Sequence, residues 1–307
     1  MSDLSDSIGG SDPALSNGAR TTAKISRSAI PDRKAAHRGR PMARMLPNSL
    51  AASRRGDVSL LRLSRPAKRN ALDPATIAGI ESFFSRPPDG TRAIILYGEG
   101  EHFSAGADLS ALTNAPASDR LHYLRSWHRA FDKIENGDVP VIAALRGAVI
   151  GGGLELAAAA HIRVAERSAY YALPESAKGI FVGGGGAVRI PRLIGTSRMI
   201  DMMLTGRTYR AEEGLALGFS QYVVDDGRAL ADALALAERI ATNTALGNFA
   251  MLQALPRIAR ADPDNGILTE ALMTSLMLGD EETRTRLDAG PEKHVPRSSP
   301  LTGSDDS

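Results

Sequence analysis

The chain has 307 residues, 43% of them hydrophobic, with a formal net charge of +2 and a pI near 9.0. This length suffices for one large α/β domain, whereas no apolar run reaches the roughly 20 residues that cross a bilayer, and no basic-then-apolar segment indicates a secretory signal. The absence of cysteine excludes disulfides, thiolate nucleophiles and thiolate metal sites. We therefore expect a globular, cytoplasmic protein without a membrane partner, whose nucleophile is an oxygen such as that of water.

The basic charge is concentrated at the N-terminus. Residues 1–45 carry 8 Lys/Arg against 4 Asp, which leaves 29 against 31 acidic residues in 46–307. Residues 1–48 are rich in Ser, Gly, Ala and Arg and have almost no apolar periodicity, which predicts a disordered basic tail. Arg-rich tails can bind nucleic acid, but this one has no aromatic residue to stack on a base, so a solvated tail is favoured.

Strand and helix patterns alternate along the middle of the chain. Strands are predicted over residues 58–63, 92–97, 140–145, 161–165, 169–173 and 221–224, and helices over 74–84, 119–136, 154–160, 187–194, 197–204, 211–217 and 228–242. Asp73 is the expected N-cap of the first helix, with Pro74 at its first position. After Asn243 the pattern is helical to about residue 287. This order predicts an α/β core over 49–243, a helical assembly segment over 244–290 and a flexible tail over 291–307.

Two turns of small residues follow apolar runs: Ser104-Ala105-Gly106-Ala107-Asp108 and Gly151-Gly152-Gly153-Leu154-Glu155. Small residues leave backbone N–H groups exposed to a ligand, and the second turn places Glu155 at the start of a helix. Glu175 supplies another carboxylate 20 residues further on. Together these features indicate acyl chemistry. Taken alone, the glycines also fit tight strand-to-helix packing, Glu155 a favourable helix first-turn acid and Glu175 a surface acid.

Three segments resemble the crotonase (enoyl-CoA hydratase/isomerase) superfamily in their order and spacing: Arg65 to Leu72, Gly98 to Leu109 and Pro140 to Glu155. The resemblance spans about residues 50–290, and several motifs in order are more specific than any one of them. It implies an α/β fold of the crotonase (ClpP-like) type, a spiral of β-β-α units forming two sheets. It also implies C-terminal helices that build homotrimers, often paired into hexamers, and an acyl-CoA substrate with no permanently bound cofactor, because coenzyme A is part of the substrate.

Within this family the chain is most similar to an enoyl-CoA hydratase, an enzyme of fatty acid metabolism that adds water reversibly to the 2,3 double bond of a 2-enoyl-CoA. The resemblance implies that the N–H groups of Ala105 and Gly152 hold the thioester oxygen, that Glu155 activates water and that Glu175 delivers the C2 proton. Like charge and an apolar pocket would raise at least one carboxylate pKa. The other positions implied in binding acyl-CoA are Asn70, Ala71, Leu72, Gly106, Ala107, Asp108, Gly151 and Gly183.

Further residues have weaker assignments. Arg65, Lys68 and Arg69 are candidate phosphate contacts, although a solvated basic cluster is the more common explanation, and Lys293 stands where family members often carry a basic residue. No metal is expected, because His122 and His128 are six residues apart, which is not a metal-ligand spacing. Trp127 is expected in the core or in a subunit interface.

Two alternative functions stay open. The segment Gly179 to Val188 departs from the family pattern, and its four successive glycines, Gly183 to Gly186, would leave room near the acyl chain. This motivates an enoyl-CoA isomerase, or a lyase acting on a bulkier acyl group, although such isomerases can work with one carboxylate near the position of Glu175. The third candidate is a non-enzymatic RNA-binding homologue, because the tail is basic.

Overall fold

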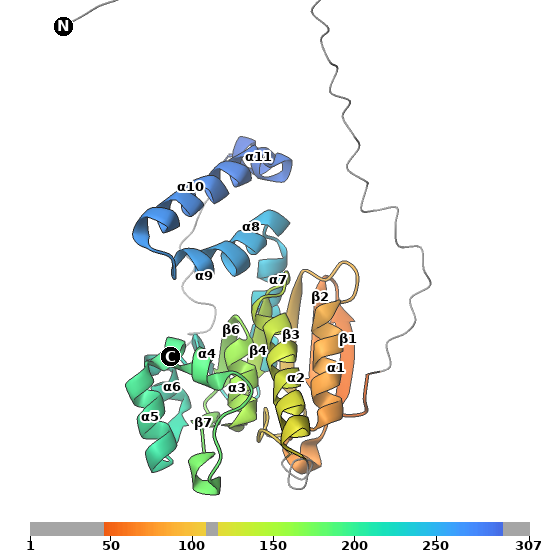
Figure 1. Cartoon of the computed structure of the whole chain (residues 1–307). Coiled ribbons are helices and arrows are strands. Elements are labelled where there is room, and N and C mark those ends of the chain that lie inside the picture. The colour runs from red at the N-terminus through yellow and green to blue at the C-terminus, as the bar shows by residue number, and fades with distance from the viewer. Residues whose placement is uncertain (1–45, 109–115, 291–307) are drawn as a thin grey trace, which may run out of the picture. The chain divides into compact units, whose positions relative to one another are not determined.

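The computed structural model describes residues 46–108 and 116–290 (Figure 1). Most of the two expected tails, including Lys293, lies outside the described residues. Residues 46–48 are described, and Leu46 packs against the hydrophobic core, so the packed part of the chain begins earlier than the expected tail boundary at residue 48. Within the described ranges, no helix combines the length and apolarity needed to cross a membrane.

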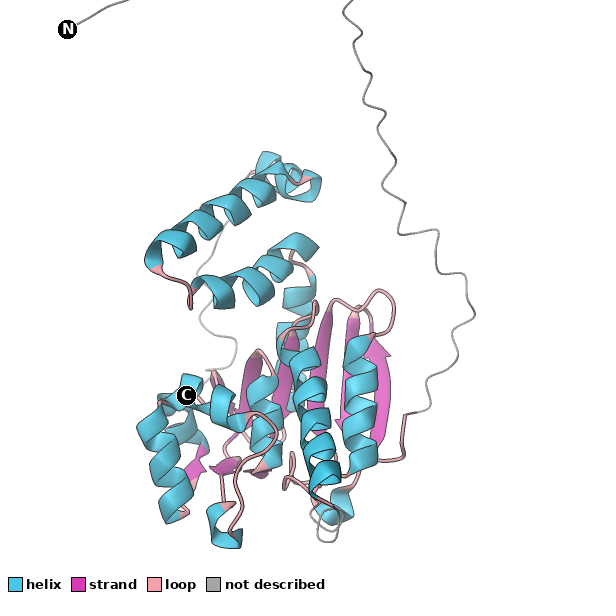
Figure 2. Ribbon diagram, viewed as in Figure 1, coloured by secondary structure: helices cyan, strands magenta, loops and turns pink. Residues whose placement is uncertain are grey.

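The larger sheet has six strands in the order β1-β2-β3-β4-β6-β9 (Figure 2). These strands are β1 (Leu50–Arg55), β2 (Val58–Leu63), β3 (Ala93–Gly98), β4 (Val141–Leu145), β6 (Ile162–Glu166) and β9 (Tyr222–Val224). β1 pairs antiparallel with β2, and the other neighbours pair parallel. All of β4 and nearly all of β3 are buried, which explains their continuous apolar runs, because a parallel sheet is covered on both faces.

The smaller sheet has the order β5-β7-β8, formed by β5 (Ala148–Ile150), β7 (Tyr170–Ala172) and β8 (Tyr209–Arg210). The sequence did not predict β1, β5 or β8. β5 and β8 have three and two residues, too few to show a periodicity. β1 is an edge strand whose last four residues are exposed, so it shows no alternation of apolar and polar residues.

Helices pack on both faces of the larger sheet, beside the smaller sheet and against one another. They are α1 (Pro74–Ser85), α2 (Ala117–Glu135), α3 (Gly152–Ala159), α4 (Gly186–Ile194), α5 (Thr196–Thr205), α6 (Ala211–Leu217) and α7 (Ala229–Ala241), with 3₁₀ turns η1 (Pro66–Lys68) and η3 (Ser176–Lys178). Ile94 and Leu96 of β3 pack into the core with α1 and α2, whereas Ala93 and Ile95 point to the opposite face and pack with α7. This alternation follows from the two-residue period of a strand.

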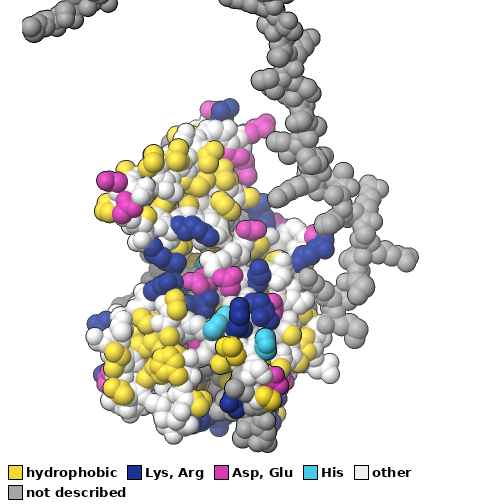
Figure 3. Space-filling view, viewed as in Figure 1, with side chains coloured by type: hydrophobic (Ala, Val, Ile, Leu, Met, Phe, Trp, Pro, Cys, Tyr) yellow, Lys and Arg dark blue, Asp and Glu magenta, His cyan; other side chains and the backbone are white. Residues whose placement is uncertain are grey.

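The C-terminal part is helical, as the sequence predicts. It comprises α8 (Ala245–Phe249), a π-helical turn η4 (Ala250–Ala254), α9 (Leu255–Ile258), α10 (Pro263–Gly279) and α11 (Glu281–Asp288). Ile267, Leu268, Leu272 and Leu276 of α10 are each more than half exposed, and Figure 3 shows apolar side chains gathered on the surface of these helices. Within the part of a single copy that the structure describes, one apolar face of α10 is therefore exposed.

Candidate active site

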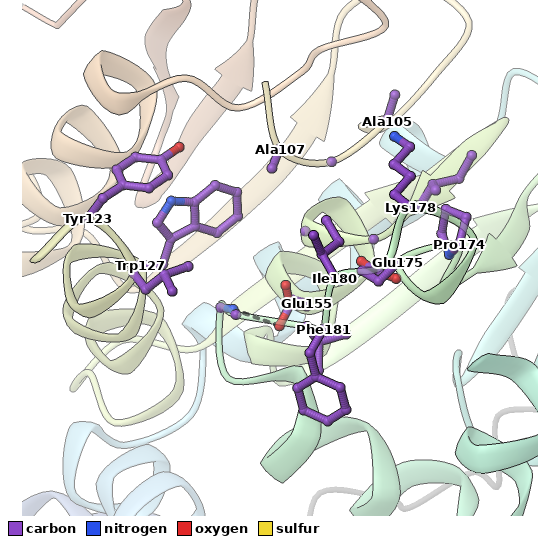
Figure 4. Close-up of a pocket in the computed structure, with 18 of the residues that line it drawn as sticks. Ala105, Ala107, Tyr123, Trp127, Glu155, Pro174, Glu175, Lys178, Ile180 and Phe181 are labelled. Atoms are coloured by element: carbon purple, nitrogen blue, oxygen red, sulfur yellow. Dashed lines mark hydrogen bonds between the residues drawn. The ribbon is translucent and has the colours of Figure 1, made fainter. Parts of the chain in front are cut away.

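A cavity of about 710 Å³ brings the two glycine-containing turns and both candidate carboxylates together (Figure 4). Its lining comes from residues 105–107, from α2, from the turn between β5 and α3 with Glu155, and from residues 174–184. Of the residues assigned from sequence, those that line it are Ala105, Gly106, Ala107, Gly151, Gly152, Glu155, Glu175 and Gly183. The fold thus assembles segments that are far apart in the chain.

Glu155 lies in the first turn of α3 and is only 3% exposed. Its Oε1 accepts two backbone hydrogen bonds, from the N–H of Gly184 at 2.8 Å and of Gly186 at 2.7 Å (Figure 4). Burial raises the pKa of Glu155, and these amide donors and the guanidinium of Arg189 oppose that increase. The pKa of Glu155 is therefore raised overall by burial, while the amide donors and Arg189 favour its ionised form and limit the increase.

Glu175 follows β7 and Pro174 and is 8% exposed. Burial, with a contribution from the charge of Glu155, raises the pKa of Glu175 to about 7, and Lys178 opposes this increase. Its Oε2 is buried without a hydrogen-bond partner among the described residues. Gly151, at φ +53°, leaves the space that this carboxyl group needs, because a Cβ there would lie 2.7 Å from Glu175 Oε1. Glu175 can therefore carry a proton near neutral pH.

The oxyanion donors differ from those expected at one position. The N–H of Ala105 donates to the Arg69 carbonyl at 2.8 Å, so Ala105 has no free donor and its expected role is wrong. The N–H groups of Ala107 and Gly152 have no acceptor among the described residues. They lie close together, since a Cβ on Gly152 would be 3.3 Å from the Ala107 nitrogen. Gly106, between the two alanines, adopts φ +90°, and the composition of the turn does not reveal which neighbouring N–H this conformation leaves free.

The segment from Arg65 to Leu72 lies outside the cavity lining. Asn70 is 1% exposed, and its side chain accepts from the Arg65 N–H and donates to the Glu99 and His102 carbonyls, which holds the turn together. Leu72 is buried, and Ala71, like Leu72, does not line the cavity. The part that Asn70, Ala71 and Leu72 take in binding coenzyme A stays a prediction.

Arg65 is held by carboxylates of its own chain. Its guanidinium pairs with Asp73 at 3.2 Å and with Asp108 at 3.0 Å, so Arg65 and Asp108 form an internal ion pair. Arg65 is therefore not a free cation for a phosphate, contrary to the expectation, and Asp108 does not line the cavity. Lys68 and Arg69 are exposed.

The run Gly183 to Gly186 does not leave empty space, contrary to the expectation from sequence. A Cβ on Gly183 would lie 2.6 Å from Leu124, one on Gly184 would lie 3.0 Å from Trp127, and one on Gly186 would lie 2.7 Å from Cγ of Glu155. The missing side chains instead allow the loop backbone to approach α2 and Glu155 closely. Trp127 is 3% exposed and belongs to the hydrophobic core, one of the two environments expected for it.

Ile180 and Phe181 line the cavity from the loop after η3, where the sequence placed the border of the acyl pocket. Sequence reasoning missed the wall that α2 contributes, in which Tyr123 and Leu124 lie beside Trp127. The only sequence signal for the α2 residues was the apolar side of an amphipathic helix, which does not distinguish a core position from a cavity wall.

The described fold, with two buried carboxylates and two free amide donors at one cavity, defines an enzyme site able to stabilise an oxyanion while protons move. The chain belongs to the enoyl-CoA hydratase/isomerase family, whose model matches residues 53–292. A solved structure assigned as an enoyl-CoA hydratase of Rhodopseudomonas palustris CGA009 is 56% identical, with a TM-score of 0.77 over 78% of this chain and 93% of that one.

Two other relatives extend the comparison. Enoyl-CoA hydratase EchA19 of Mycobacterium tuberculosis is 36% identical over 69% of this chain and 81% of its own length. A Thermobifida fusca YX structure assigned as an enoyl-CoA hydratase, solved in complex with CoA, is 28% identical, with a TM-score of 0.71 over 76% of this chain and 93% of that one. The crotonase fold and the family resemblance are thus confirmed. The family thus places the chain among the enzymes of the crotonase superfamily.

Proposed function

We propose that the protein is an enoyl-CoA hydratase, which adds water reversibly across the 2,3 double bond of a 2-enoyl-CoA. The observation that carries this proposal is the contrast between the two carboxyl groups of one cavity. Oε1 of Glu155 accepts two amide hydrogen bonds, which favour its ionised form, whereas Oε2 of Glu175 is buried without a hydrogen-bond partner among the described residues and the pKa of Glu175 is raised to about 7. Hydration needs one base and one acid at the same time, and these environments provide both. The Thermobifida fusca complex with CoA supports a coenzyme A thioester as the substrate class.

The mechanism follows from the positions of these groups. Glu155 accepts a proton from water as the water oxygen bonds to C3, and electrons of the double bond move toward the thioester oxygen. The N–H groups of Ala107 and Gly152 donate to that oxygen as its negative charge develops, and loss of one such donor costs about 3 kcal/mol. Protonated Glu175 then donates its proton to C2, which gives the 3-hydroxyacyl thioester. Proton exchange between the carboxyl groups and water restores the starting state, and no resident cofactor is needed.

The isomerase reaction is the second candidate, and Glu175 carries it, because a buried carboxyl group with a pKa of about 7 can take and return a proton alone. Double-bond isomerisation would leave Glu155 without a chemical role. Glu155 is buried at the cavity with two amide donors that favour its ionised form, which supports the hydratase because hydration uses a base at this position.

The test measures the loss of the conjugated enoyl-thioester absorbance over a panel of 2-enoyl-CoAs. Glu155→Gln and Glu175→Gln should each lower kcat sharply and leave CoA affinity largely unchanged, because an amide keeps the shape and loses the acid/base function. Glu238→Gln, at an exposed position of α7, is the matched control. If Glu155→Gln keeps full activity on 3-enoyl-CoA isomerisation and wild type adds no water, the isomerase is correct.

We also propose that the chain assembles as a homotrimer, or as a hexamer of two trimers, through its C-terminal helices. The exposed leucines Leu268, Leu272 and Leu276 of α10 support this, because single chains rarely leave such an apolar face in water. Light scattering after gel filtration should give a multiple of three protomers, and Leu272→Lys should shift the mass toward the monomer. A monomeric wild type would contradict the proposal.

A further inference from the structure

We propose that Arg189 is a positioning residue for Glu155 and acts through the glycine loop Gly183 to Gly186. The inference rests on the proposed function, because it assigns to Arg189 a part in keeping the base of that reaction in place. Arg189 does not line the cavity, and the mechanism above gives it no direct contact with substrate.

The contacts form a continuous chain from α2 to Glu155. The Arg189 side chain is 10% exposed, and its Nε donates to Oε2 of Glu135, the last residue of α2, at 2.7 Å. Its Nη1 donates to the Gly184 carbonyl at 3.2 Å. The N–H of Gly184 in turn donates to Oε1 of Glu155 at 2.8 Å. Gly184 is therefore held at both of its polar groups, by Arg189 on one side and by Glu155 on the other.

The loop needs such a contact because of its composition. Four successive glycines lose more conformational entropy on ordering than any other residues, so the loop has little preference of its own for the conformation that presents two N–H groups to Glu155. Gly185 adopts φ +94°, and a Cβ there would lie 2.3 Å from Nη1 of Arg189. The guanidinium thus lies directly against the loop backbone, where only glycine leaves room for it.

The charged groups around Arg189 also influence the ionisation of Glu155. Glu135 is also within 3.6 Å of Arg192, and His128, Arg129 and Asp132 of α2 border the same surface depression as Arg189. On the other side, the negative charge of Glu155 contributes to the raised pKa of Glu175. The guanidinium of Arg189 favours the ionised form of Glu155, so its removal weakens both the position and the ionisation of the base.

The experiment compares Arg189→Met, which removes the charge and the donors, with Arg192→Met. The control residue lies on the same helix near the same Glu135, but it is 46% exposed and, among the described residues, makes no hydrogen bond to the glycine loop. Arg189→Met should lower kcat for hydration by about 10²-fold with little change in KM, because a small displacement of a reacting group has that effect. The lower limb of its kcat-against-pH profile should move to higher pH. Arg192→Met should leave kcat and the profile unchanged.

A second measurement separates this inference from the hydratase proposal. Hydrogen–deuterium exchange of the peptide covering residues 179–188 should be faster in Arg189→Met than in wild type, whatever reaction the enzyme performs. Without the Arg189 contact to the Gly184 carbonyl, the loop opens more often and its Gly184 and Gly186 amides separate from Oε1 of Glu155. Unchanged exchange together with unchanged kcat and pH profile overturns the role of Arg189. If Arg189→Met does not fold, Arg189→Lys provides the test, because lysine keeps the positive charge but lacks the planar guanidinium group. The kcat of Arg189→Lys should still fall, and a kcat equal to that of wild type overturns the inference.

Discussion

Replacement of Glu175 by Gln tests whether the pKa of this carboxyl group is raised in the folded protein. The measurement is the pH dependence of the unfolding free energy, which does not depend on catalysis. The carboxyl group ionises near 4.5 in an unfolded chain, whereas burial raises its pKa to about 7 in the folded protein. The folded protein therefore holds this proton more tightly than the unfolded chain. The stability that results is fully present below pH 4.5 and is lost as the pH rises through 7. Gln is uncharged throughout and undergoes no such loss.

The magnitude follows from the two pKa values. They differ by about 2.5 pH units, and each pH unit corresponds to about 1.4 kcal/mol, so the upper limit of the effect is about 3 kcal/mol. Glu175 lines a cavity that water can enter, and hydration of the carboxylate lowers the cost of its ionisation. We therefore expect Glu175→Gln to gain about 1–3 kcal/mol of unfolding free energy relative to wild type between pH 4.5 and pH 8.5.

The assay is urea unfolding of wild type and Glu175→Gln at both pH values, at one fixed protomer concentration because assembly would add to the apparent stability. Glu238→Gln is again the control and should show the same pH dependence as wild type. An equal free-energy difference between Glu175→Gln and wild type at both pH values would refute the reasoning, since it would mean that the carboxyl group ionises alike in the folded and unfolded chains.

Three other substitutions test the local structure. Gly153→Ala should cost about 1–3 kcal/mol of unfolding free energy, because the new Cβ would lie 2.5 Å from the Ser104 carbonyl oxygen. The same substitution should lower kcat; chemical unfolding measures the first effect and initial rates the second. Asn70→Ala should cost about 3 kcal/mol in the same unfolding assay, because it removes three buried hydrogen bonds and places Ala at φ +55°. Asp73→Ala should cost about 1 kcal/mol and lower the melting temperature slightly, because Asp73 caps α1 through the Thr76 N–H at 2.7 Å; unchanged melting would rule out this cap.

Local patterns in the sequence determined the elements with enough residues to show a periodicity. The apolar runs of β3 and β4 and the Asp73 cap of α1 were readable because strand burial and capping depend on residues close in the chain. Glu155 and Glu175 were also correctly brought to one cavity, because the family motifs fix their order and spacing. Short strands such as β5 gave no signal.

Only the tertiary structure decided which polar groups are free to act. Ala105 and Ala107 have the same side chain, and the difference between them is that the Ala105 N–H is occupied by the Arg69 carbonyl. Likewise, the sequence suggested that Arg65 is a solvated cation or a phosphate contact, whereas in the fold it pairs with Asp73 and Asp108. Hydrogen-bond occupancy, ion pairing and burial depend on residues far apart in the chain. For that physical reason the sequence determined the kinds of chemical group in this site, and the packing of the folded chain decided which of them face the cavity and in which charge state.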